Sequence, residues 1–352
     1  MKSSSIVTRR GFSLTELMVA MTIALMIMGA VATLFGMFGR SLSSSQATVD
    51  LAARMRGAAW QLRKDLGGVT CEVVPWLAPE ADAGYFEYVE GPRNDQSAAH
   101  GTASLEADTY DVVLFTARSL GEPFVGAAAN GTVEAECAEM AWFCRPMPSQ
   151  PVTGVTLHNL HRRQLLVAAV PGAGPFGAGA AVNGSGQPYS VRVGSDGRTR
   201  PNSLGDLTKR EHRFLRENAF PFEFQGGSAA GATLDGTDQE GNDIVLGNVI
   251  AFDVRAFDPQ ASSYVDLGGG GTSLLGAAPQ QKSGLTKPTY DTWSCHYEFA
   301  NQSGGALGEA GQYTTSPPYL VPLRGIEVRI RCYEPTSKQV RQVTVRHTFV
   351  KK

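Results

Sequence analysis

The sequence has little net charge and few cysteines. Its 31 lysines and arginines nearly balance its 33 aspartates and glutamates, so no global positive field attracts nucleic acid. Five cysteines, an odd number, allow at most two internal disulfides. Because no CxxC pair is present, a structural zinc site is disfavoured. Cys137 and Cys144 are the closest pair, and they are candidates for a local disulfide if the body of the protein is exported.

The sequence also lacks a catalytic constellation. It contains no GxSxG turn and no recognisable pair of catalytic carboxylates. A GxGxxG run at residues 172–177 has a proline inside it and no amphipathic helix after it, which argues against a dinucleotide site. His158 and His161 lie three residues apart in an expected extended segment, with no adjacent third ligand for a metal. We therefore do not expect an enzyme.

What the sequence does have is one long apolar run near its start, from Phe12 to Gly39. The apolar part of a cleaved secretory signal has only about 7–15 residues. This run instead has the length of a spanning helix, which needs about 20 residues. Lys2, Arg9 and Arg10 precede it. These positive charges predict a single pass with the N-terminus in the cytoplasm and the body outside.

An acid, Glu16, lies near the beginning of the apolar run. A carboxylate within a bilayer costs about 2.5–3.5 kcal/mol on insertion scales, so it usually has a partner or a function. One interpretation is local, because Ser13 and Glu16 have the spacing of a helix capping box. An acid there also favours the positive end of the helix dipole. A second interpretation comes from the residues around it.

The segment Gly11-Phe12-Ser13-Leu14-Thr15-Glu16-Leu17 follows basic residues and precedes the apolar helix. It resembles the class III signal of type IV pilins and type II secretion pseudopilins. The resemblance implies that residues 1–11 are a leader, which prepilin peptidase removes by cutting between Gly11 and Phe12. Phe12 would then be N-methylated. The resemblance also implies that Glu16 attracts the terminal amine of a neighbouring subunit during assembly.

Residues 40–68 predict an amphipathic continuation of the helix that residues 12–39 begin. Apolar residues recur at steps of three and four, which is the spacing of one helical face. They are Ala52, Met55, Ala59, Leu62 and Leu66. Gly67 and Gly68 predict the end of the helix.

Residues 69–352 predict a β-rich globular domain, so the fold class is α+β. Apolar runs of strand length occur at residues 111–117, 139–145, 162–170 and 249–259. Residues 325–349 predict a terminal antiparallel hairpin with one apolar and one charged face. Cys332 lies on the apolar face and is expected to be a buried thiol. A glycine-rich stretch near residues 172–190 suggests a division into two sheet lobes, and other glycine-rich segments predict loops.

The order of these features resembles the larger minor subunits, namely J-type pseudopilins of type II secretion and PilW-type minor pilins. This resemblance implies a bacterial inner-membrane protein with a periplasmic C-terminal domain that later joins a periplasmic fibre. The implied partners are other minor and major pilins or pseudopilins, prepilin peptidase and an inner-membrane assembly platform. A membrane-anchored module that binds a polymer or DNA is the alternative. No groove for nucleic acid is indicated by the sequence.

One oxygen-rich loop is a candidate calcium site, and no other cofactor is expected. Its residues are Asp235, Asp238, Glu240, Asn242 and Asp243. The loop lacks the order and the closing glutamate of an EF-hand. A solvated turn is the plain alternative.

Overall fold

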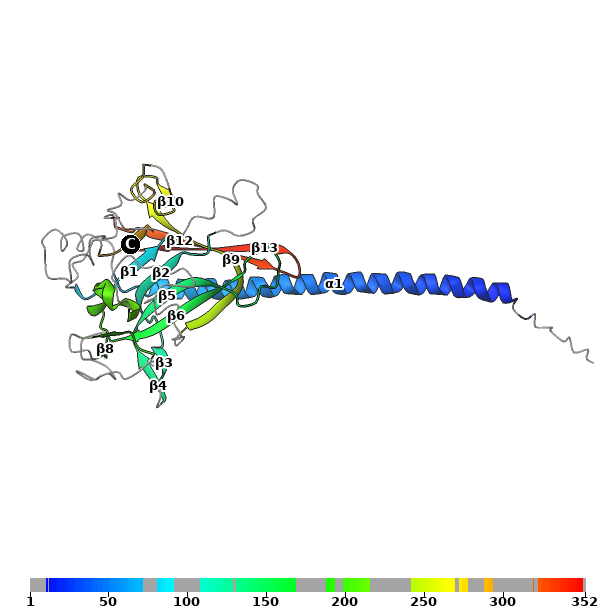
Figure 1. Ribbon diagram of the computed structural model, residues 1–352, viewed down its shortest axis with the longest axis horizontal. Helices are drawn as coiled ribbons and strands as arrows, with labels where there is room; N and C mark the ends of the chain where they lie inside the picture. The colour runs from blue at the N-terminus through cyan, green and yellow to red at the C-terminus, as the bar shows by residue number, and fades with distance from the viewer. Residues whose placement is uncertain are drawn as a thin grey trace, which may run out of the picture. The chain divides into compact units, whose positions relative to one another are not determined.

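One long helix precedes a mostly antiparallel β-sheet body in the computed structural model, which confirms the α+β class (Figure 1). The structure describes residues 11, 13–71, 81–91, 108–128, 131–168, 188–193, 199–215, 242–269, 272–277, 288–293, 319 and 322–350. Helix α1 spans Leu14–Gly67, and two short 3-10 helices are η2 (Asp206–Thr208) and η3 (Arg210–Leu215). The strands are β1 (Phe86–Val89), β2 (Val112–Arg118), β3 (Phe124–Ala128), β4 (Gly131–Ala135), β5 (Cys137–Pro146), β6 (His158–Val167), β7 (Val191–Val193), β8 (Thr199–Pro201), β9 (Asn242–Asp258), β10 (Ser263–Val265), β11 (Thr289–Asp291), β12 (Gly325–Glu334) and β13 (Gln339–Thr348).

Helix α1 joins the expected apolar run and its amphipathic continuation in one unbroken element, and it ends at the predicted Gly67. By its internal contacts the chain forms two compact units, residues 1–50 and residues 51–352. The C-terminal part of α1 therefore belongs to the same unit as the sheet. The two units are described separately below.

The main sheet has nine strands in the order β11-β1-β2-β5-β6-β9-β12-β13, with β10 paired to β9. Strand β6 precedes the glycine-rich stretch near residues 172–190, and β9 follows it, yet the two strands pair directly. The expected division into two sheet lobes is therefore wrong. Two separate two-stranded sheets, β3–β4 and β7–β8, supplement the main sheet instead.

The apolar strand patterns correspond to β2, β5, β6, β9 and the terminal hairpin β12–β13. In that hairpin the predicted apolar face is buried, with Ile326, Val328, Ile330 and Cys332 all at 0% exposure. Burial raises the pKa of the Cys332 thiol to about 12, as expected for an inert core cysteine. Strand β9 begins earlier than predicted, at Asn242.

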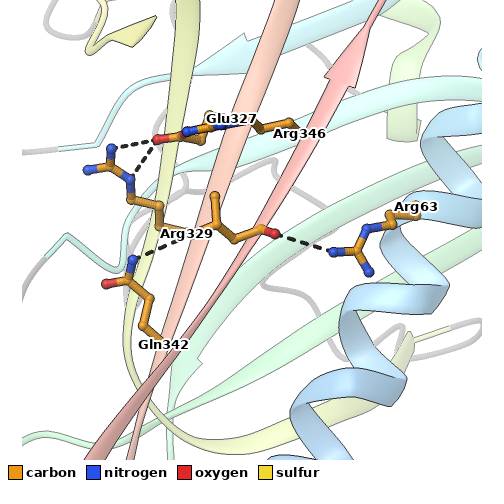
Figure 2. Close-up of a pocket in the computed structure, with 6 residues that line it drawn as sticks. Arg63, Glu327, Arg329, Gln342 and Arg346 are labelled. Atoms are coloured by element: carbon orange, nitrogen blue, oxygen red, sulfur yellow. Dashed lines mark hydrogen bonds and ion pairs between the residues drawn. The ribbon is translucent and has the colours of Figure 1, made fainter.

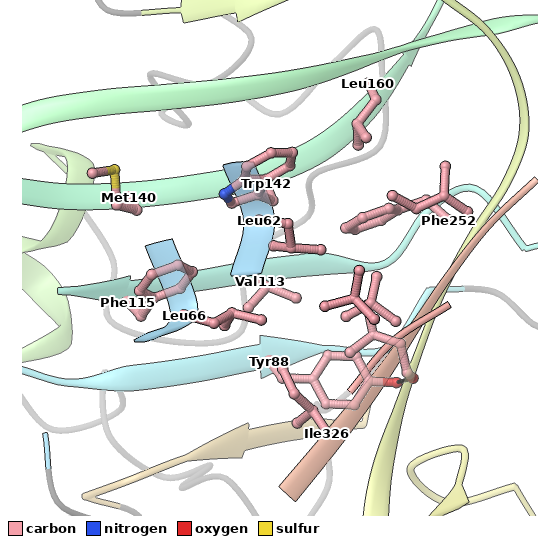
Figure 3. Packing of buried hydrophobic residues seen from close by; sticks show 14 of the residues in the cluster. Leu62, Leu66, Tyr88, Val113, Phe115, Met140, Trp142, Leu160, Phe252 and Ile326 are labelled. Carbon is pink, nitrogen blue, oxygen red and sulfur yellow. Dashed lines mark hydrogen bonds between the residues drawn. The ribbon is translucent and has the colours of Figure 1, made fainter. Parts of the chain in front are cut away.

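One face of the sheet is covered by the C-terminal part of α1. The helix buries an apolar stripe that packs into a single core with the sheet residues (Figure 3). The buried helix residues are Leu51, Met55, Ala58, Ala59, Leu62 and Leu66. In Figure 3, Leu62 and Leu66 lie among Val113, Phe115 and Trp142. The amphipathic spacing is thus explained by packing on the protein's own sheet.

The opposite face of the sheet is covered by the segment that contains η2 and η3. Leu207 and Phe214 from this segment join a second apolar cluster with β-strand residues such as Leu114 and Phe143. Strand β2 is consequently buried on both faces, which explains its continuous apolar run. Nothing in the sequence pattern indicated this second cover.

A buried ion triad fixes the second cover to the edge of the sheet. The Arg213 guanidinium contacts Glu87 of β1 at 2.8 Å and also contacts Asp291 of β11. It lies over the Tyr85 ring with 3.8 Å between the guanidinium carbon and the ring centroid. All three charged side chains are fully buried. The triad therefore ties η3 to two strands that are about two hundred residues apart in sequence.

A second buried ion pair attaches the end of α1 to the sheet. Asp65 accepts hydrogen bonds from Arg162 Nε at 2.7 Å and Arg162 Nη2 at 3.1 Å. The Trp142 indole N–H donates to the same carboxylate at 3.0 Å, and Gln61 donates at 3.0 Å. Because Asp65 is 2% exposed and Arg162 is 8% exposed, neither charge is well solvated without the other.

Replacement of Arg162 by Met tests this attachment. We expect the free energy of unfolding to fall by about 3–5 kcal/mol, because the buried Asp65 carboxylate loses its cation. Chemical denaturation of the full chain in detergent, followed by tryptophan fluorescence, measures the change. Arg118→Met removes an exposed pair with Glu136 at 3.9 Å and should cost at most about 1 kcal/mol. Equal effects of the two substitutions would contradict the role assigned to Arg162.

Candidate assembly site at the start of the helix

The start of α1 is held by a reciprocal capping box. The Ser13 N–H donates to Glu16 Oε2 at 2.9 Å, and the Glu16 N–H donates to Ser13 Oγ at 3.2 Å. Leu17 N–H donates to the Ser13 carbonyl at 3.1 Å. Two N–H groups at the helix start are therefore satisfied by side chains. This confirms the local interpretation of Glu16.

The same carboxylate is also accessible to a second partner. Both Ser13 and Glu16 are exposed, and the capping hydrogen bond uses Oε2 of Glu16. Gly11 is described and exposed. Residues 1–10 and Phe12 lie outside the described residues, so cleavage between Gly11 and Phe12 and methylation of Phe12 stay predictions.

Helix α1 is the element of the described chain that is long and apolar enough to cross a membrane. Within the unit formed by residues 1–50, none of the most apolar part of this helix is buried. Its large apolar residues include Leu14, Leu17, Met18, Met26, Met28, Phe35 and Phe38, each more than half exposed. An apolar surface of this length requires lipid or other apolar helices around it.

Comparison with known proteins gives one match. Residues 7–32 match the family described as the prokaryotic N-terminal methylation motif. The match covers Gly11, Ser13 and Glu16 and most of the apolar helix start. No curated protein and no solved structure matches the chain. The motif and the helix together support a type IV pilin-like prepilin that is processed by prepilin peptidase and anchored in a membrane.

The motif implies assembly with other pilins. The two histidines that the sequence analysis disfavoured as metal ligands lie in the described part of the chain. His158 lies 3.5 Å from the Thr109 hydroxyl, whereas His161 stacks on Phe143 at 5.4 Å between ring centroids. The two histidines thus contact different neighbours. The GxGxxG run at residues 172–177 lies outside the described residues.

The expected disulfide between Cys137 and Cys144 is wrong. Both residues belong to the extended strand β5, where seven residues span about 23 Å at about 3.3 Å per residue. An odd separation also places them on opposite faces of the sheet. Accordingly, Cys137 lies in the second apolar cluster, while Cys144 packs against the core under α1.

The candidate calcium loop is mostly outside the described residues, which include neither Asp235, Asp238 nor Glu240. Asn242 and Asp243 begin strand β9, where they pair with β6, and Asp243 is exposed. Calcium binding by this loop stays a prediction.

A buried cluster of three acids, which the sequence analysis missed, lies where β1, β2 and β9 meet. Carboxylate oxygens of Glu90, Asp108 and Asp111 lie within 4.8 Å of one another, and all three residues are at most 3% exposed. Asp111 accepts backbone N–H groups of Gly91 at 2.8 Å and Val254 at 2.7 Å. These contacts give the cluster a structural role in joining the strands.

Burial raises the pKa of both Glu90 and Asp111 well above the usual range, and the neighbouring carboxyls raise it further. Glu90 Oε2 accepts the Tyr88 hydroxyl and the Leu267 N–H. Because a proton on one acid removes its repulsion from the next, protonation stabilises the folded cluster. The acids come together only because β1 pairs with β2. Strand β1 was too short for the sequence pattern to predict it.

Glu90→Gln tests the protonated state of the cluster. In the unfolded chain Glu90 ionises near its usual pKa of about 4.3, whereas the folded protein holds its proton to higher pH. Stability from this group is therefore complete below that pKa and is lost as pH rises toward the folded pKa. The variant has no proton to lose at this position. We expect the difference in Tm, variant minus wild type, to become more positive as pH rises.

The measurement is thermal unfolding of the full chain in detergent at a series of pH values. Glu122→Gln, at an exposed position, is the matched control and should give a difference that does not change with pH. A pH-independent difference for Glu90→Gln would show that Glu90 is ionised in the folded protein.

Proposed function

We propose that this chain is a minor pilin or pseudopilin subunit at or near the tip of a type II secretion pseudopilus or a type IV pilus. One observation carries the proposal: the methylation motif at residues 7–32 continues into a helix whose apolar surface is uncovered. The order of strands β5, β6, β9 and β12 supports a minor subunit, because their sequences resemble those of the larger minor subunits.

The proposed mechanism begins with storage in the bacterial inner membrane, with the N-terminus in the cytoplasm and the body in the periplasm. Prepilin peptidase cuts after Gly11, and Phe12 becomes the methylated terminus. The apolar helix then leaves the bilayer by packing against helices of other subunits. Contact between helices replaces contact with lipid, so the apolar surface does not meet water.

Glu16 is proposed to set the position of the subunit in the fibre. Its carboxylate attracts the terminal amine of a neighbouring subunit, and the pairing offsets the cost of a charge in low dielectric. The capping box supports this role, because it holds the carboxylate at the helix start, where the terminal amine of a subunit also lies. Assembly then requires the charge of Glu16 rather than its capping hydrogen bond.

Mass spectrometry of the mature protein tests the processing step. We expect the mature chain to begin with N-methylated Phe12. Removal of Gly11 by substitution with a bulkier residue should leave the leader attached. A chain that keeps Met1, or one that is cut beyond Phe38, would instead indicate a plain membrane anchor or a secreted body and would favour the alternative of an anchored binding module.

A pair of substitutions separates the two roles of Glu16. Glu16→Gln keeps an acceptor for the Ser13 N–H but removes the charge, so we expect normal processing and poor incorporation into the fibre. Ser13→Ala removes the hydroxyl that caps the Glu16 N–H but keeps the charge. It should cost about 1 kcal/mol of helix stability and still permit assembly.

Incorporation is measured by co-isolation of the processed subunit with sheared fibres. Normal incorporation of Glu16→Gln would refute the charge-pairing role. If Ser13→Ala fails to be incorporated while Glu16→Gln is incorporated normally, the whole function of this site is capping.

A further inference from the structure

Strand β13 forms one end of the main sheet. It pairs with β12 through ten consecutive residue pairs without a register shift. No other described strand pairs with it. An outer strand of this kind presents unpaired N–H and C=O groups, which can pair with an additional strand.

A contact with α1 identifies the outward groups of β13, which are the backbone N–H and C=O groups that point away from β12. Arg63 Nη2 donates to the Thr344 carbonyl at 3.3 Å, from the side of the helix (Figure 2). In an antiparallel strand the N–H and C=O of one residue point the same way, and alternate residues point in opposite directions. Gln342, Thr344 and Arg346 therefore direct their backbone groups outward.

Two features that often prevent pairing at a sheet edge, a proline and a bulge, are absent from β13. Residues 339–348 contain no proline, and the ladder with β12 has no bulge. The charged residues of β13, Arg341 and Arg346, are both positive and exposed. A second strand with positive charge would be repelled, whereas an acidic strand would be attracted.

A groove of about 610 Å³ lies beside this edge and is lined by Arg63, Glu327, Arg329, Gln342, Thr344 and Arg346 (Figure 2). Its one acid, Glu327, is buried and already accepts hydrogen bonds from Arg329 at 2.7 Å and Arg346 at 2.6 Å. Although burial disfavours its charge, these two arginines hold the pKa of Glu327 below the usual range. With Glu327 ionised, the lining residues carry three positive charges and one negative charge, and Arg329 also lies 3.8 Å from Asp253.

We propose that this groove binds an extended acidic segment of a neighbouring subunit, which adds to the sheet as a strand beside β13. The outward backbone groups of Gln342 and Arg346 pair with its backbone, whereas the Thr344 carbonyl already accepts Arg63 Nη2. The exposed Arg346 and the remaining N–H groups of Arg63 attract its carboxylates. The inference rests on the proposed function, because the partner is another subunit of the fibre.

The backbone groups of β13 and the arginine side chains have different roles in the proposed binding. Backbone pairing supplies affinity along the strand, since the outward N–H and C=O groups of Gln342 and Arg346 gain partners. The arginines supply selectivity for acidic sequences. Because the Arg346 side chain is 67% exposed, each ion pair contributes little by itself and is screened by salt. Binding should therefore weaken as the salt concentration rises, and it should still require the outward backbone groups of β13.

Peptide binding to the purified full chain in detergent tests the proposal. The probe is a fluorescent nine-residue peptide in which glutamate alternates with threonine and valine, and the comparison peptide has lysine in place of glutamate. We expect fluorescence anisotropy to show binding of the acidic peptide, several-fold weaker binding at high salt, and no binding of the lysine peptide.

Two variants locate the binding site. Gln342→Pro removes one outward N–H without removing a bond to β12, and it should abolish binding. Arg346→Glu reverses one charge of the groove and should weaken binding several-fold. Arg118→Glu, at an exposed arginine outside the groove, is the matched control and should bind as wild type does. Tryptophan fluorescence confirms that each variant is folded.

Equal binding of both peptides, or binding that neither Gln342→Pro nor Arg346→Glu weakens, would overturn the proposal. Self-association of the wild-type chain that Gln342→Pro abolishes would identify a second copy as the occupant and would also overturn it. The assay needs neither processing nor a fibre. Correct processing without peptide binding therefore refutes this inference alone, and peptide binding by a chain that is never processed refutes the proposed function alone.

Discussion

The position of α1 on the sheet depends on one charged side chain in an unfavourable place. Asp65 lies in the last turn of α1, where the helix dipole disfavours an acid. It is retained because Arg162 and the Trp142 indole supply three hydrogen bonds to it from β5 and β6. With this end fixed, Leu62 and Leu66 have a single position over the strands, and the whole apolar stripe is placed against the sheet.

Buried charged side chains of the sheet body occur in two kinds of surroundings. Arg162 and Arg213 each lie at ion-pair distance from buried carboxylates. In the cluster of Glu90, Asp108 and Asp111, burial favours the protonated form of Glu90 and Asp111. Loss of a proton from this cluster as pH rises destabilises the folded protein. The acid cluster is therefore the part of the sheet whose stability we expect to depend on pH.

Local features of this chain could be predicted from sequence, and features that depend on strand pairing could not. The capping box of Ser13 and Glu16 involves residues three apart, so spacing alone reveals it. The face alternation of β12 is equally local. Strands β1 and β11 have four and three residues, which is too short for a periodic signal. The acid cluster and the cover formed by η2 and η3 arise only when distant segments meet, and the disulfide prediction failed because it relied on separation in sequence.

The place of β11 in the sheet has a consequence for the order in which the molecule can be completed. Strand β1 lies between β2 and β11, and Glu87 of β1 aligns with Asp291 of β11. In a chain that is synthesised from its N-terminus, one side of β1 lacks its β11 neighbour until residue 291 has emerged. Such long-range pairing makes closure of the sheet slow. The chain therefore passes through an intermediate with an incomplete sheet, and such an intermediate is prone to aggregation.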